Sequence, residues 1–259
     1  MKTMVSTDEE LVEASQLHWD DVVDVICAGV GPGVLAHAIW CTDLDLDVEF
    51  ADAELSSQTS DPDTAAYLQS MTDDLEPAAD RGLELAVVHA KPVVVSKDRR
   101  ATIEPFFGSR LRDFSARCAA SPFGVIYSQI PDNMTSLRAG GETIRAAVLG
   151  DYRPETDRPG LELAEWLRGQ ADERGLLDEA DTALERLVFE DGRVAGAALS
   201  TPDGTRLVRA IVGVALSIGP VPDAADWPVQ SGLLSGASQV AVVSRTASRF
   251  GLVELLYSS

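Results

Sequence analysis

The sequence predicts an α/β protein with a mostly parallel sheet and an added antiparallel meander, and three observations predict it. A nearly continuous apolar run at 22–28 is typical of a strand buried on both faces, as in parallel sheets. A glycine-rich turn, a short helix and a second strand follow at once, in the order of a βαβ unit. Further along, Asp191-Gly192 lies between two apolar runs, which indicates a tight hairpin.

The first part of the chain divides into a leader and the start of the domain. Residues 1–17 are expected to form a flexible acidic leader, and 18–259 a single domain. After the glycine turn, the apolar spacing predicts a helix at 34–42 and a strand at 46–51. Asp61-Pro62 then provides an N-cap and a first-turn proline for a helix that reaches residue 75.

In the second part of the chain the predicted helices and strands alternate less regularly. The stretch around 91–150 is expected to be an irregular insertion, with a helix within 109–119. An amphipathic helix is predicted at 159–175, where Gly175 provides the C-cap. The meander strands are expected at 184–190, 193–200 and 206–218, and the last two strands at 239–244 and 252–256.

The net charge of −21 excludes some classes of partner. Residues 1–80 hold 19 Asp and Glu and a single base, Lys2, a net of −18, whereas the other 179 residues amount to only −3. Nucleic-acid recognition and docking to an anionic bilayer both need a basic face, so neither partner is expected. The apolar fraction of 45% is that of a folded protein.

The sequence contains no signal for a membrane span, a signal peptide or a metal site. No run of about 18 apolar residues occurs, and the first residues are acidic and polar. Cys27, Cys41 and Cys118 are scattered and odd in number, which fits a reducing cytoplasm. The three histidines have no ligand-like spacing, so no metal is expected. These features predict a cytoplasmic protein.

The strongest site signal is the turn Gly29-Val30-Gly31-Pro32-Gly33, between a buried strand and a helix. Glycines there permit a tight turn and let the backbone approach a pyrophosphate, which then lies on the helix N-terminus. Asp52 ends the next strand, where a carboxylate accepts from a ribose hydroxyl. The pattern predicts a Rossmann-like FAD/NAD(P)-binding domain with Gly29, Val30, Gly31, Pro32, Gly33 and Asp52 as cofactor-binding residues. A glycine turn that binds no ligand is the alternative.

Three stretches resemble the FAD-binding domain of the fumarate reductase and 3-ketosteroid dehydrogenase flavoproteins. They are WDDVVDV at 19–25, LVFEDGRVAG at 187–196 and RAIVGVALSIG at 209–219, and they follow the order of that family. The resemblance implies an FAD cofactor and, for an enzyme, hydride transfer at the flavin. The chain departs from the family where Val34 replaces the third glycine and where no capping domain follows, so no catalytic residue is carried over.

The acidity of residues 1–80 bears on any phosphate site. No Lys or Arg lies within 3–80, so backbone N–H groups, or Arg99, Arg100 or Arg110 from the basic stretch 91–117, would have to hold the phosphates. These bases could instead pair with the acidic N-terminal surface.

Two main hypotheses follow from the sequence. The first is a small FAD-binding flavoprotein, and, if it is an enzyme, an FAD-dependent oxidoreductase acting on an unknown substrate or with a partner. The second is a degenerate, non-catalytic relative that serves as a protein-interaction scaffold, as a homo-oligomer or with another protein. Binding of a smaller nucleotide such as ADP or NAD is a third.

Overall fold

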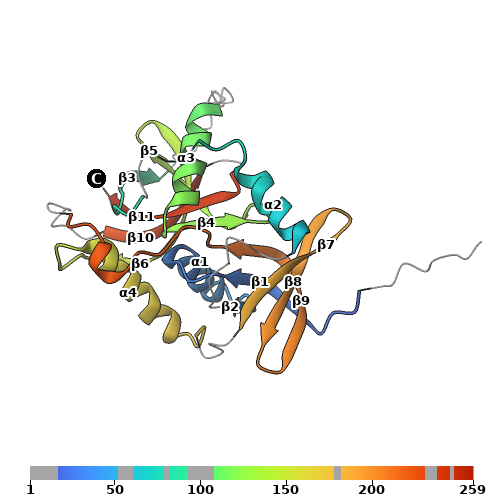
Figure 1. The fold of residues 1–259 in the computed structure, drawn as a ribbon. Coiled ribbons are helices and arrows are strands. Elements are labelled where there is room, and N and C mark those ends of the chain that lie inside the picture. The colour runs from blue at the N-terminus through green and yellow to red at the C-terminus, as the bar shows by residue number, and fades with distance from the viewer. Residues whose placement is uncertain are drawn as a thin grey trace, which may run out of the picture.

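The computed structural model describes residues 17–51, 61–76, 78, 82–92, 108–177, 182–230, 238–245 and 248–258. The expected leader lies almost wholly outside these residues. Eleven strands form one continuous sheet (Figure 1). Strands make up 42% of the described residues and helices 26%, so the protein is mostly β.

The predicted βαβ unit is present at the start of the sheet. It consists of β1 (Asp21–Ala28), α1 (Pro32–Asp43) and β2 (Val48–Ala51), and β1 and β2 pair in parallel. On its other side β1 pairs in parallel with β9 (Gly204–Leu216). Apolar side chains on both faces of β1 are buried, which explains its continuous apolar run.

The predicted meander is confirmed as well. β7 (Ala183–Glu190) and β8 (Arg193–Thr201) form an antiparallel hairpin, and β8 then pairs antiparallel with β9. Asp191 and Gly192 both have positive φ, 48° and 73°, as the two central residues of a tight hairpin turn require.

A closed five-stranded barrel forms the other part of the sheet. Its strand order is β10-β6-β5-β3-β11, and the pairing of β10 with β11 closes it. The short strand β4 (Gly124–Tyr127) joins β11 to β9 and so links the barrel to the parallel strands. Apolar side chains from all five barrel strands form one cluster. The barrel strands are β3 (Val87–Pro92), β5 (Thr135–Ala139), β6 (Glu142–Tyr152), β10 (Ser238–Arg245) and β11 (Phe250–Ser258).

The predicted fold class is therefore wrong. An α/β, Rossmann-like FAD/NAD(P)-binding domain would place most strands in a parallel sheet between helices, whereas parallel pairing here is confined to β1–β2, β1–β9 and β3–β11 among the described strands. The closed barrel overturns the prediction. Three of its strands come from the stretch around 91–150 and its borders, where an irregular insertion was expected. Two of them form a local hairpin with Gly140 and Gly141 at positive φ in its turn, a signal that the sequence contained and that the prediction missed. The pairing of the first and last barrel strands, far apart in the chain, leaves no trace in local periodicity.

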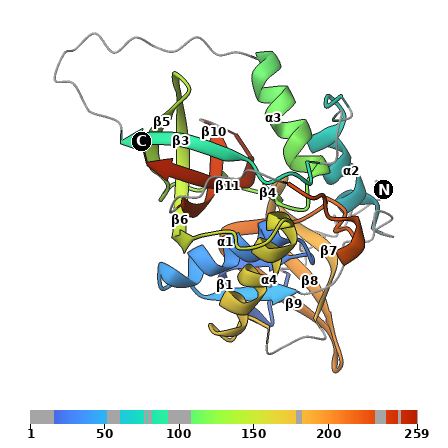
Figure 2. The same cartoon turned by 90° about the vertical axis from the view of Figure 1, so that its left-hand side faces the viewer.

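Four helices cover the sheet. α1 and α4 (Pro159–Asp172) pack against each other, and α2 (Pro62–Thr72) lies against β7. α3 (Gly108–Ala120) lies across β11 and β4 beside the barrel (Figure 2). A short 3₁₀ helix occupies Ala224–Asp226. Within the described ranges, none of these helices has the length and apolar character that crossing a bilayer requires.

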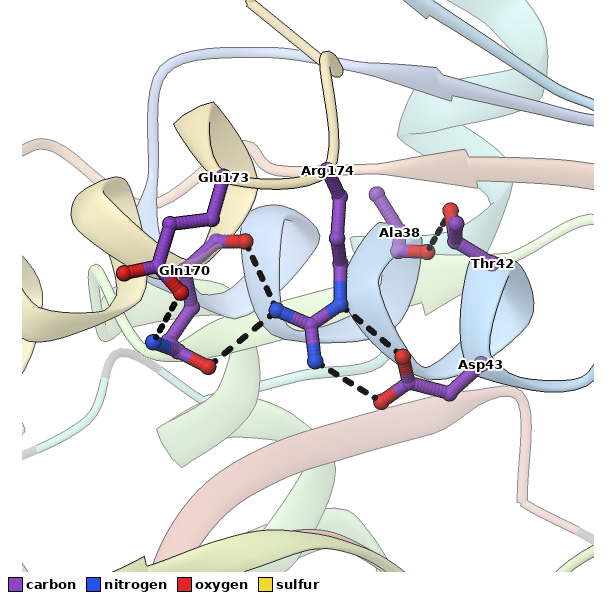
Figure 3. Close-up of polar contacts among 6 residues, drawn as sticks. All are labelled: Ala38, Thr42, Asp43, Gln170, Glu173 and Arg174. Atoms are coloured by element: carbon purple, nitrogen blue, oxygen red, sulfur yellow. Dashed lines mark hydrogen bonds and ion pairs between the residues drawn. The ribbon is translucent and has the colours of Figure 1, made fainter.

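Arg174 ties the C-terminal ends of α1 and α4 together (Figure 3). Its Nε and Nη2 donate to the two carboxylate oxygens of Asp43, at 2.9 and 3.2 Å, and its Nη1 donates to the carbonyl and side-chain oxygens of Gln170. A cation placed over helix C-termini also opposes their negative dipole ends. Part of the acidity of the N-terminal segment is therefore neutralised by a base from the second half of the chain.

We expect Arg174→Met to lower the free energy of unfolding by about 1 kcal/mol, because the pair is bidentate but partly exposed. Arg174→Lys should recover less than half of the loss, since an ammonium cannot span both carboxylate oxygens. Urea unfolding of these variants and of Asp43→Asn, combined in a double-mutant cycle, measures the coupling. A coupling indistinguishable from zero would contradict the role given to this pair.

Candidate functional site

The glycine turn lies where the sequence predicts, between β1 and α1. Gly29, Gly31 and Gly33 are buried, Val30 is half-buried, and Pro32 is the first residue of the helix. The sixth predicted residue, Asp52, lies outside the described residues, directly after the end of β2. Whether this turn can bind an anion must therefore be judged from the geometry of the turn alone.

The N–H groups at the start of α1 are already used. Pro32 has no N–H to offer, and the N–H of Gly33 donates to the carbonyl oxygen of Pro122 at 3.1 Å. The N–H of Val34 donates to the carbonyl of Gly31 at 3.2 Å, within the first turn. A phosphate at a helix N-terminus needs these groups free and pointing at it.

The space over the glycines is filled by the chain itself. A Cβ on Gly31 would overlap the hydroxyl of Ser217, and a Cβ on Gly33 would lie 2.6 Å from the carbonyl oxygen of Phe123. Two further glycines allow close backbone packing in the same region. A Cβ on Gly124 would overlap the end of α3, and a Cβ on Gly219 would overlap the backbone before Pro122. We call Gly31, Gly33, Gly124 and Gly219 the glycine junction.

The arrangement does not fit a dinucleotide pyrophosphate. Pro32 has no N–H, the N–H groups of Gly33 and Val34 are bonded within the chain, and backbone from 121–124 and 217–219 occupies the approach to the turn. The glycines instead permit backbone-to-backbone packing of three segments, which is a structural reason for the same pattern. We therefore derive no chemistry through a flavin at this turn.

The glycine junction predicts an order of stability losses. Gly33→Ala should cost about 3 kcal/mol, because rigid backbone at 123–124 must move. Gly31→Ala should cost less, and Ser217→Ala should restore part of that loss, because the unpartnered Ser217 hydroxyl is one of the atoms in the way. Thermal and urea unfolding measure both.

Gly169→Ala is the matched control for these variants. Gly169 is exposed in α4 with no atom near its Cβ position, so the same substitution should stabilise the helix by about 0.5–1 kcal/mol. Equal losses for Gly33→Ala and Gly169→Ala would contradict the packing role of the junction.

Two polar side chains of α1 pack in the interior beside the turn. His37 and Cys41 are buried on α1, with Nε2 and Sγ 3.5 Å apart, and the His37 ring packs against that of Tyr127. Burial lowers the pKa of His37 to about 3 and raises the pKa of Cys41 to about 12. An imidazole with so low a pKa is a weak base, and a thiol with so high a pKa forms little thiolate, so the pair is poorly suited to nucleophilic catalysis.

The basic stretch pairs differently from the expectation. Arg99 and Arg100 lie outside the described residues, whereas Arg110 pairs with Glu142 on β6, away from the acidic N-terminal segment. Arg117 on α3 donates to Glu254 on β11, Nη2 to Oε1 at 3.3 Å. The bases that do reach the N-terminal acids come from later in the chain, as Arg174 and Arg206 show.

Glu254 is the side chain that sequence reasoning missed. It is 1% exposed, on the same strand face as Leu256 of the barrel cluster. Burial raises the pKa of Glu254, although the charge of Arg245 and, less strongly, that of Arg117 lower it. Its Oε2 has no hydrogen-bond partner within the described part of the chain. The signal in the sequence was a lone acid in the apolar run 252–256.

Arg245 belongs to the same group of charged side chains as Glu254. It is the last residue of β10, and its guanidinium carbon lies 4.7 Å from the centre of the Phe114 ring on α3. Its Nε is 3.9 Å from Glu142, and its Nη1 is buried without a partner among the described residues. We call Arg110, Arg117, Arg245, Glu142 and Glu254 the α3–barrel charge cluster.

Known proteins give no further guide to this site. No protein-family model matches the chain, and no curated protein matches its sequence. Nor do three or more Cys, His, Asp or Glu gather in a metal-binding group anywhere in the ranges that the structure describes. The charge cluster and the glycine turn must therefore be judged by their geometry.

The raised pKa of Glu254 predicts how stability depends on pH. In the folded state its carboxylate forms at a higher pH than in the unfolded chain, so stability present below the ordinary value of 4.5 is lost as the pH rises through the folded-state pKa. Glu254→Gln should remove this loss and become more favourable, relative to the wild type, as the pH rises above the ordinary value of 4.5.

Urea unfolding across this range measures the difference. Glu190→Gln is the control for the loss of one negative charge, because Glu190 forms an exposed pair with Arg209. A difference between Glu254→Gln and wild type that is constant with pH would contradict a buried, destabilising carboxylate.

Proposed function

We propose that this protein is a non-catalytic interaction scaffold that has no use for a dinucleotide cofactor. The observation that carries the proposal is the engaged start of α1, where Gly33 donates to Pro122 and Pro32 has no donor. In a nucleotide enzyme these groups would be reserved for the phosphates. Here these N–H groups instead form bonds within the chain that hold the barrel against the parallel strands.

The charge of the chain supports a protein partner with a basic surface. A net charge of −21 favours association with cationic proteins and raises its rate, and it disfavours nucleic acids. A cytoplasmic location belongs to this proposal, supported by three free, buried cysteines, which a reducing compartment keeps as thiols.

A small FAD-binding flavoprotein is the competing function. The resemblance at 19–25, 187–196 and 209–219 supports it, as does the parallel β1–α1–β2 unit. Flavin binding would require Pro122 and the Ser217 segment to move off the turn, and the same holds for NAD or ADP. If it occurs, hydride transfer at the flavin would be the reaction class.

A cofactor titration separates the two functions. We expect the purified protein to be colourless, and FAD, NAD and ADP at 1 mM, roughly the upper end of physiological cofactor affinities, to leave its Tm unchanged. Flavin fluorescence should show no saturable quenching. Under the scaffold proposal Gly31→Asp lowers Tm by overpacking alone, whereas under the flavoprotein proposal it also abolishes a measurable flavin signal.

Ser217→Ala is the control for the cofactor titration. Ser217→Ala removes the hydroxyl that overlies Gly31 and leaves the turn sequence intact. A yellow preparation, or saturable quenching by FAD in wild type or in Ser217→Ala, would overturn the scaffold proposal and establish the flavoprotein.

A further inference from the structure

An exposed apolar pair lies where β1 and β9 run side by side (Figure 1). Val22 is 49% exposed and Ile211 is 64% exposed. The register pairs Val22 with Arg209, so Ile211, two residues further along β9, lies diagonally next to Val22 on the same side of the sheet. Further along β1, Val25 and Cys27 are buried in one cluster with side chains of α1. The helix therefore covers the later part of β1 and leaves its start open.

Trp19 and Arg209 extend this pair into a strip. The guanidinium carbon of Arg209 lies 5.9 Å from the centre of the Trp19 ring. Both side chains are held by Glu190, which accepts from Trp19 Nε1 at 3.2 Å and from Arg209 Nη2 at 3.0 Å. Side chains fixed in this way lose little freedom on binding, and Trp and Arg are frequent anchors of protein interfaces. We call Trp19, Val22, Arg209 and Ile211 the apolar strip.

Carboxylates border the apolar strip. Asp20 and Asp24 lie two residues before and two residues after Val22. Asp24 Oδ2 accepts from the N–H of Asp47 at 2.9 Å, which brings a third acid to the same border. These three acids form no ion pair with any residue that the structure describes, and the charge of Arg209 is already met by a glutamate. An exposed apolar surface with a polar border is typical of a protein interaction site.

We propose that the apolar strip binds a basic, amphipathic segment of a partner protein, whose apolar side chains pack against Val22 and Ile211. The Lys or Arg side chains of that segment lie beside Asp20, Asp24 and Asp47, where opposite charges favour the encounter. A second copy of this chain would bring the same carboxylates against one another, which disfavours it as the occupant. The inference rests on the proposed scaffold function and names the surface that the scaffold uses.

Three labelled helical peptides of about 18 residues, or five turns, test the chemistry. The Leu/Lys peptide has a leucine stripe bordered by lysines, the Leu/Glu peptide has glutamates in their place, and the Ser/Lys peptide has serines in place of the leucines. We expect saturable binding of the Leu/Lys peptide and none of the Leu/Glu peptide. The Ser/Lys peptide should bind at least about tenfold more weakly, because apolar burial is lost. Fluorescence anisotropy at about 0.15 M salt, where distant exposed charges are screened, measures each.

Variants locate the binding on the protein. Ile211→Thr and Val22→Thr keep a β-branched side chain on the strand and remove apolar surface, so each should weaken the Leu/Lys peptide, Ile211→Thr by about tenfold. Asp24→Asn keeps an acceptor for the N–H of Asp47 and should weaken binding less at high salt than at low salt. Val229→Thr is the matched control, because Val229 is 58% exposed outside the strip, and it should leave binding unchanged. The Tm of each variant confirms that it folds.

Several results would overturn the proposal. They are the absence of saturable binding of the Leu/Lys peptide, equal binding of the Ser/Lys peptide, and binding that Val22→Thr and Ile211→Thr leave unchanged. A wild-type dimer in sedimentation that Ile211→Thr dissociates would assign the strip to a second copy instead. The cofactor titration stays separate: FAD binding would overturn the scaffold function whatever the peptides do, whereas a failure of the peptides alone would remove this surface and leave the scaffold function standing.

Discussion

The close approach of three backbone segments at the glycine junction positions the two parts of this protein. The β1–α1 turn, the 121–124 turn before β4 and the 217–219 segment after β9 meet where Gly31, Gly33 and Gly219 have no side chains. The carbonyl of Pro122 completes the junction by accepting from Gly33. Because β4 leads on to β11 and the barrel, the same contact that closes the start of α1 also holds the barrel against the parallel strands.

The fold brings together opposite charges that lie far apart in the sequence. The N-terminal 80 residues carry almost the whole negative excess, and the described structure brings Arg174 and Arg206 to Asp43 and Glu49 from far along the sequence. Arg110 and Arg117 of α3 pair with glutamates of the barrel strands, away from that surface. The chain as a whole keeps a net charge of −21, and this excess is the physical basis for the proposed basic protein partner.

The local elements could be predicted from the sequence, and the architecture could not. The βαβ unit, the Asp191-Gly192 hairpin and the helix at 159–172 rest on contacts within or between neighbouring elements, which leave a period or a turn residue in the sequence. The barrel depends on pairing of β3 with β11 and of β6 with β10, about 90 residues or more apart in the chain, for which no local pattern exists. The glycine motif was ambiguous because close packing against a phosphate and against a backbone demand the same residue.

The two candidate sites differ in whether their polar groups have hydrogen-bond partners. At the start of α1 Pro32 has no N–H and the N–H groups of Gly33 and Val34 are satisfied by the chain, although the motif is the most recognisable in the sequence. At the α3–barrel charge cluster no motif exists, yet Glu254 and Arg245 keep hydrogen-bonding atoms that the described chain leaves unmet. A buried charged group with an unmet hydrogen-bonding atom lowers stability, because the cost of removing it from water is not fully compensated. Unmet polar atoms therefore occur at both places, because the Ser217 hydroxyl over Gly31 also lacks a partner among the described residues, and they do not by themselves choose between the two sites.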